Sequence, residues 1–198
     1  MNLSILQVMA NLKDLLDGFF ASRPFVYKGN ADAETFKPAI PKVYVYTVPP
    51  EDRTESGYPV HAPAICLCLD GVEVKDDAMH ARISAHIAVI DPSTSEAERV
   101  VYNKETGKWT YSDGKDFDQS RAFQDLYEQA VLLENEVMYA LMRAAYTEMR
   151  VSSITMAPPP VALPDFPHAE CVVNFQVLYG GAHGGSYEAV PDDYTKYL

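Results

Sequence analysis

The feature of the sequence that most constrains the fold is an apolar stripe at helical spacing between residues 120 and 149. Small and branched apolar side chains recur every three or four residues, and charged side chains fall off the stripe. The stripe comprises Leu126, Ala130, Leu133, Val137, Leu141 and Ala144, whereas Glu128, Glu134, Glu136 and Arg143 lie off it. At 1.5 Å per residue this helix would be roughly 40 Å long, enough to cross a whole sheet. We therefore predict that it is the main packing helix.

Several segments before and after this helix have the composition of β-strands. Residues 42–48 are β-branched and aromatic, which favours a strand. Residues 64–69 form an apolar run ended by Asp70-Gly71, which indicates a central strand covered on both faces. Residues 171–179 are expected to form the last strand, and one face of it would carry Cys171, Val173, Phe175, Val177 and Tyr179.

Residues 80–90 alternate cleanly between two faces. One face would carry Ile83, Ala85, Ile87 and Val89, and the other Arg82, Ser84, His86 and Ala88. Residues 99–102 and 108–111 flank a turn-forming stretch and predict a β-hairpin within residues 98–118.

The remaining segments complete the expected order. Ser4 and Gln7 have the capping-box spacing at the start of a helix whose buried face would be Ile5, Met9, Leu12, Leu16 and Phe19. Residues 23–41 are expected to be irregular, and the proline-rich stretch from 151 to 167 an extended connector.

Together these patterns predict an α+β fold in a single domain spanning residues 1–198. We expect a mostly antiparallel sheet packed on one side by an N-terminal helix and one long helix. The β-hairpin at 98–118 would be an insertion, and residues 180–198 a flexible C-terminal arm.

The net charge limits the classes of partner that the protein can bind, and the cysteine content indicates the redox state of its compartment. The 16 Lys and Arg against 28 Asp and Glu leave a formal charge of −12, which repels nucleic-acid phosphates and anionic membranes. We expect no sequence-specific nucleic acid and no membrane as partners. Cys66, Cys68 and Cys171 predict free thiols in a reducing compartment, and no signal peptide is expected.

The sequence contains no motif that indicates a catalytic or cofactor site. A cluster of Cys66, Cys68, Cys171, His80 and His86 would suit zinc if the strands paired side by side, but the spacing is C-x-C, and packed core residues are the preferred interpretation. The glycine-rich residues 180–185, with His183, lack the Lys-Ser/Thr pair of a phosphate loop. Ser186 lies on no strand-to-helix elbow. Glu128, Glu134 and Glu136 read as a solvated helix face, and Asp76-Asp77 as a turn. We expect no metal and no cofactor.

Aromatic residues make the hairpin and the arm candidate contact surfaces. The residues expected to contact another subunit or partner are Arg99, Tyr102, Trp109, Tyr111, Tyr187, Tyr194 and Tyr197. The alternative for the hairpin is that its aromatic side chains pack back on their own sheet. The arm carries three tyrosines with little else to pack against, so we expect it to order on a neighbouring subunit.

The order and lengths of these elements resemble the tail terminator, or tail completion, proteins of long-tailed bacteriophages and their minor-tail relatives. In that family an N-terminal helix precedes a strand, a Tyr-Pro segment leads into a central apolar strand, an alternating strand ends in Asp-Pro or similar, and a long helix precedes a final strand. The matching pieces are residues 4–20, Tyr58-Pro59 with 64–69, 80–91, 120–149 and 170–179. They cover about two-thirds of the chain, in order and length rather than in a diagnostic motif.

The resemblance implies a non-enzymatic virion protein, assembled in the host cytoplasm. Such proteins form rings, commonly hexamers, that cap the tail tube and offer a surface to the head–tail connector proteins. They have no catalytic residues. The hairpin, the proline-rich connector and the arm depart from the compact members, so terminator, neck protein and another ring component all remain open.

Two other classes of function also remain open. One is a small cytosolic enzyme whose site includes Arg82, His86 and Asp91. The other is a monomeric binding module that uses the hairpin as an edge for a partner strand or peptide.

Overall fold

The centre of the molecule is a five-stranded sheet. The computed structural model describes residues 3–28, 36–53, 59, 61–76, 78–90, 100–111, 119–144, 149–157 and 168–180. The strand order is β3-β4-β5-β9-β8. These strands are β3 (Lys42–Val45), β4 (Ala64–Lys75), β5 (Ala78–Ile90), β9 (His168–Tyr179) and β8 (Met149–Ala157). β3 runs parallel to β4 and all other neighbours are antiparallel, which confirms the predicted α+β class.

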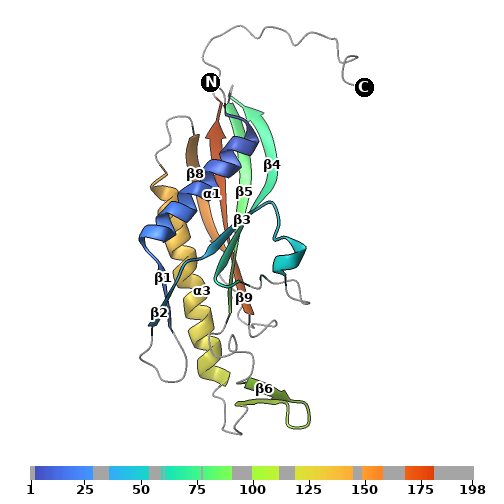
Figure 1. Cartoon of the computed structure of the whole chain (residues 1–198). Coiled ribbons are helices and arrows are strands. Elements are labelled where there is room, and N and C mark those ends of the chain that lie inside the picture. Colours follow the sequence, from blue (N-terminus) through green and yellow to red (C-terminus); the bar gives the residue numbers. More distant parts are fainter. Residues whose placement is uncertain are drawn as a thin grey trace.

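Two helices, α1 (Ile5–Ser22) and α3 (Gln119–Met142), cover one face of this sheet (Figure 1). Their apolar faces meet the inward-facing side chains of the strands in one core. Its largest fully buried members are Met9, Leu12, Leu16, Phe20, Ile65, Leu67, Ile83, Ile87, Leu126, Leu133 and Leu141. The long helix is therefore the main packing helix, as its apolar stripe predicts.

The predicted capping box of α1 is present. The Ser4 hydroxyl accepts from the backbone N–H of Gln7, and the Gln7 side chain accepts from the backbone N–H of Ser4. The predicted buried face is wrong at two positions, because Val8 and Phe20 are fully buried, whereas Ile5 and Phe19 are only partly buried. Phe19 instead packs edge-on against Phe20 and against Tyr139 of α3, with centroid distances of 5.1 and 6.1 Å.

The alternation predicted for β5 and β9 is confirmed. The predicted inward residues of both strands that the structure describes are buried, including Ile87 and Val173. The antiparallel register pairs Ala85 with Val173 and Ile87 with Cys171, so the apolar side chains of both strands face α3.

Strand β4 differs from the prediction in length and in coverage. It passes through Asp70 and Gly71 and continues to Lys75, because a β-bulge between Leu69 and Gly71 absorbs the turn-like residues. Before the bulge, Ile65 and Leu67 on the helix-facing side are buried, whereas Cys66 and Cys68 on the other face are only half-buried. Beyond the bulge, Val72 and Val74 are 45% and 72% exposed, so the helix layer covers only the first part of the strand.

The segment after the long helix was predicted wrongly. α3 ends at Met142 rather than at 149, and residues 149–157 form the edge strand β8 instead of an extended connector. Pairing with β9 supplies the backbone hydrogen bonds of this segment, and a register shift between Ser152 and Thr155 bulges it. A neighbour distant in sequence therefore decided the structure here.

The region expected to be irregular contains a second small sheet. β1 (Phe25–Lys28) pairs antiparallel with β2 (Phe36–Ala39). β3 then ends at Val45, because Tyr46 adopts a φ of 70°, and the 3-10 helix η1 (Pro50–Asp52) follows.

The predicted hairpin is confirmed as a separate two-stranded sheet. β6 (Val100–Asn103) pairs antiparallel with β7 (Lys108–Tyr111). The Asn103 side chain accepts from the backbone N–H groups of Glu105 and Thr106, and Gly107 takes a φ of 66° that closes the turn. The C-terminal arm beyond Gly180 lies outside the described residues.

In the part of the chain that the structure describes, neither helix is long and apolar enough to cross a membrane.

Truncating the central contact of α3 tests its role in the core. We expect Leu133→Ala to lower the free energy of unfolding by about 2–5 kcal/mol, because the side chain is fully buried and leaves a cavity. Urea unfolding followed by circular dichroism measures the change. The adjacent Leu132 is 56% exposed, so Leu132→Ala serves as the matched control and should cost less than about 0.5 kcal/mol. Equal losses in the two variants would contradict this packing.

Candidate functional site

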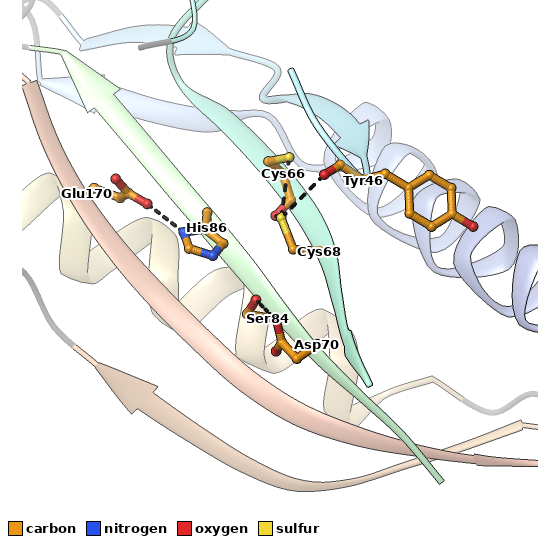
Figure 2. A network of polar contacts seen from close by, with 7 residues as sticks. All are labelled: Tyr46, Cys66, Cys68, Asp70, Ser84, His86 and Glu170. Carbon is orange, nitrogen blue, oxygen red and sulfur yellow. Dashed lines mark hydrogen bonds and ion pairs between the residues drawn. The ribbon is translucent and has the colours of Figure 1, made fainter. Parts of the chain in front are cut away.

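The sheet face that the helices leave uncovered carries a row of polar side chains (Figure 2). β4 contributes Cys66 and Cys68, β5 contributes Ser84 and His86, and β9 contributes Glu170. The register sets Cys66 opposite His86 and Cys68 opposite Ser84. Alternation along each strand places these side chains away from the core, so they form one surface.

His86 and Glu170 form an ion pair across β5 and β9. Nδ1 of His86 donates to Oε1 of Glu170 at 2.6 Å, and the two side chains are 41% and 43% exposed. The hydrogen bond to Glu170 raises the pKa of His86, and partial burial opposes this shift. Sequence analysis missed Glu170, because 84 residues separate it from His86 and only the strand register brings them together.

The two thiols of the C-x-C segment lie side by side. Their Sγ atoms are 3.9 Å apart, and Cys68 Sγ donates to the carbonyl oxygen of Tyr46 at 3.7 Å. Burial, with a smaller contribution from Cys68, raises the pKa of Cys66 to about 12. The Cys66 thiol therefore stays protonated at neutral pH.

Cys66, His86 and Glu170 have the residue types of a nucleophile, a base and an orienting carboxylate, but the arrangement lacks the required electrostatics. A catalytic thiol needs a pKa lowered toward neutrality by a neighbouring imidazolium or helix N-terminus. The pKa of Cys66 is raised instead, and its hydrogen-bond partner in Figure 2 is Cys68. The geometry gives no support for nucleophilic catalysis at Cys66.

The structure does not assemble the zinc cluster considered from the sequence. Cys171 lies on the opposite face of the sheet, where its thiol donates to the carbonyl oxygen of Ala130 in α3 at 3.5 Å. His80 shares the open face but is six residues from His86, or about 20 Å along the strand. Among the described residues, no group of three or more His, Cys, Asp or Glu could hold a metal ion.

The enzyme alternative based on Arg82, His86 and Asp91 gains no support from the geometry. Arg82 and His86 share the open face of β5 at a separation of four residues, which is about 13 Å. The Arg82 guanidinium lies over Gly71, where a Cβ would approach it to 3.1 Å. Asp91 lies outside the described residues.

One predicted solvated carboxylate is buried. Glu128 is exposed and Glu136 half-buried, but Glu134 is 0% exposed. Burial raises the pKa of Glu134, and the backbone amide of Ala157 in β8 opposes this only partly. No hydrogen bond of good geometry reaches either carboxyl oxygen from the described residues. The prediction failed because the end of β8 packs beside this flank of α3.

Of the predicted contact residues, the structure describes only those in the strands of the hairpin, and among them only Tyr102 with its side chain. Tyr102 is 47% exposed, and the register sets it directly opposite Trp109, with Tyr111 opposite Val100. The side chains of Trp109 and Tyr111 lie outside the described part of the chain. Arg99, Tyr187, Tyr194 and Tyr197 lie outside it entirely. The register thus sets the backbones of Tyr102 and Trp109 opposite each other in the hairpin.

The His86–Glu170 pair predicts a pH-dependent contribution to stability. Because the folded-state pKa of His86 lies above 6.5, the contribution is present below pH 6.5 and is lost as the pH rises through the folded value. We expect Glu170→Gln to return the NMR-titrated pKa of His86 toward 6.5 and to cost less than about 1 kcal/mol, since both partners are partly exposed. Asp76→Asn, in the exposed turn after β4, is the control. An unchanged His86 titration in Glu170→Gln would show that the pair is absent in solution.

We expect substitution of the buried Glu134 to stabilise the protein, whereas substitution of Glu170 destabilises it slightly. Because its folded-state pKa is raised, the stability of the protein falls as the pH rises from 4.5 through that value. We expect Glu134→Gln to increase the free energy of unfolding at neutral pH by about 1 kcal/mol, and the gain to vanish below pH 4.5. Urea unfolding across pH measures this, with the exposed Glu128→Gln as control. A destabilised Glu134→Gln at neutral pH would mean that the carboxylate is paired.

A scan against models of protein families finds no match for this chain, and a search of curated proteins finds none either.

Proposed function

We propose that this protein is a structural virion protein that forms a homo-oligomeric ring at the tail end or neck of a long-tailed phage, in the manner of a tail terminator. The order α1, β3, β4, β5, α3, β9 supports the proposal, because it is the order of elements on which the resemblance to that family rests. A ring subunit acts by fitting against copies of itself and needs no catalytic group.

The observation that carries the proposal is that the two outer surfaces of the molecule differ in chemistry. The outer side of the helix layer exposes large apolar side chains, Leu6 at 66%, Leu132 at 56% and Met142 at 68%. The open face of the sheet carries hydrogen-bonded polar groups instead, among them His86 with Glu170 and Ser84 with Asp70. A ring closes through a heterologous contact, which requires two different and complementary surfaces on one subunit.

The remaining partners follow from this role. The ring would sit on the tail tube protein and present its other side to the head–tail connector proteins, within the virion. A net charge of −12 suits a component beside a passage for DNA, because like charge prevents the phosphate backbone from adhering. Reading frames for a tail tube protein and a tape-measure protein beside the gene would favour this role over a cellular one.

Measuring mass at several concentrations tests the proposal. We expect analytical ultracentrifugation to find a species several times heavier than the 22.0 kDa chain, and electron microscopy to show closed rings. Deleting residues 186–198 should weaken association while the circular dichroism spectrum stays unchanged.

Deleting only 194–198, which removes two of the three arm tyrosines, is the graded control and should have an intermediate effect. A single 22.0 kDa species at every concentration would contradict self-assembly and favour a monomeric binding module.

A further inference from the structure

Two arginines and a tyrosine form a cationic cluster where the C-terminal ends of α1 and α3 come together. The guanidinium carbon of Arg143 lies 4.5 Å from the centroid of the Tyr139 ring, and that of Arg23 lies 5.6 Å from the same centroid. Arg23 also lies 5.4 Å from the Phe19 ring. We call Arg23, Tyr139 and Arg143 the arginine–tyrosine cluster. Stacking on aromatic faces holds both guanidiniums in place while leaving their N–H groups available to an acceptor.

The cluster has more positive than negative charge. Among the described residues, Glu136 is the only carboxylate in an ion pair with either guanidinium, and its Oε2 lies 3.9 Å from Nη2 of Arg23. The side chains of Arg23 and Glu136 are 54% and 39% exposed. In a chain with a net charge of −12, a local excess of positive charge on the surface is a specific place for an acidic segment to bind.

Apolar side chains border the cluster on the same helix. Leu132, Glu136, Tyr139 and Arg143 recur at the spacing of one helical face, and Met142 adjoins it. Leu132 and Met142 are among the most exposed large apolar side chains that the structure describes. The surface therefore suits a segment that carries both carboxylates and aromatic rings.

Residues 181–198 of this chain have that composition. They contain the carboxylates Glu188, Asp192 and Asp193 and the tyrosines Tyr187, Tyr194 and Tyr197, with Lys196 as the single Lys or Arg and His183 as the one histidine. Carboxylates can accept bidentate hydrogen bonds from guanidinium groups, and tyrosine rings can pack on Met142 and Leu132. Charge and side-chain type are thus complementary between this segment and the cluster.

The segment begins at the far end of the subunit from the cluster. A Cβ at Gly180 would lie 3.9 Å from the carbonyl oxygen of Leu3, so the end of β9 adjoins the start of α1. Arg23 follows the other end of this helix, whose 18 residues span about 27 Å. Figure 1 shows the end of β9 beside the N-terminus and away from the C-terminal end of α1. In a head-to-tail contact, such opposite ends of two neighbouring copies come together.

We propose that residues 186–198 of one copy bind the arginine–tyrosine cluster of the neighbouring copy, with the acidic side chains on Arg23 and Arg143 and the tyrosines on the bordering apolar surface. This inference rests on the proposed ring assembly and identifies the contact that joins one subunit to the next. The occupant is a second copy of this chain, and binding of the segment to its own subunit is an outcome that the experiment distinguishes.

A charge-reversal series in the full chain tests the electrostatic part. We expect Arg143→Glu to weaken association about tenfold at low salt, measured by analytical ultracentrifugation. Combining it with Asp192→Lys and Asp193→Lys should restore association, because the reversed pair attracts again. Arg150→Glu, on the exposed edge strand β8, is the matched control and should leave association unchanged. Arg143→Gln, checked by circular dichroism, separates lost attraction from any effect of a new acidic residue on folding.

Photo-crosslinking tests the location. A photoreactive phenylalanine analogue at position 194, in a mixture of isotope-labelled and unlabelled chains, should crosslink to the α3 peptide of the other chain. The same analogue at the exposed position 46, which lies outside the proposed contact, is the control. Crosslinks within one chain, or crosslinks to other surfaces, would overturn the inference.

Different results would contradict the ring assembly and the docking of residues 186–198 on the arginine–tyrosine cluster. If oligomers form but Arg143→Glu and its rescue leave their stability unchanged, the docking inference is wrong and ring assembly stands. If the unaltered chain remains at 22.0 kDa at every concentration, ring assembly is wrong and the intersubunit contact falls with it.

Discussion

The rest of the structure depends on burial of the apolar stripe of α3 against β5 and β9. Leu126, Leu133 and Val137 are removed from water by the inward side chains of these strands. Each fully buried leucine contributes about 1.5–3 kcal/mol relative to exposure, so this contact dominates the favourable side of folding. α1 extends the same layer, and its residues Leu12 and Leu16 complete the core over the other half of the sheet.

A consequence of this arrangement is that, among the described residues, the main core lies on one face of the sheet. The opposite face carries a small apolar cluster of Tyr44, Val48 and Ala64 together with polar contacts such as His86 with Glu170, and the outer side of the helices keeps exposed apolar side chains. Under the proposed ring assembly, contact with further copies of the chain would cover Leu6, Leu132 and Met142 and give both surfaces a role in assembly.

The polar groups of the molecule also divide into those buried inside the fold and those exposed at its surface. Glu134 is buried beside β8 with its charge disfavoured, which is a cost within the fold. The arginine–tyrosine cluster is exposed and, among the described residues, more positive than negative, so an acidic partner of the kind proposed would bind there at little cost in desolvation. The Cys66 thiol is neutral and packs beside that of Cys68, so the role of the C-x-C pair in the described fold is that of small polarisable side chains.

The sequence by itself determined the elements with strong local signals. The capping box at Ser4, the alternation of β5 and β9, the hairpin turn at Asn103 and the stripe of α3 were all predicted, because neighbouring residues alone decide these patterns. The tertiary structure decided where α3 stops and β8 begins, how β4 continues past Gly71, and that Glu134 is buried. It also brought His86 to Glu170 and Arg23 to Tyr139, across long stretches of chain. These features depend on strand pairing and helix packing between distant segments, and no local periodicity encodes which distant segment will supply the hydrogen bond or the covering side chain.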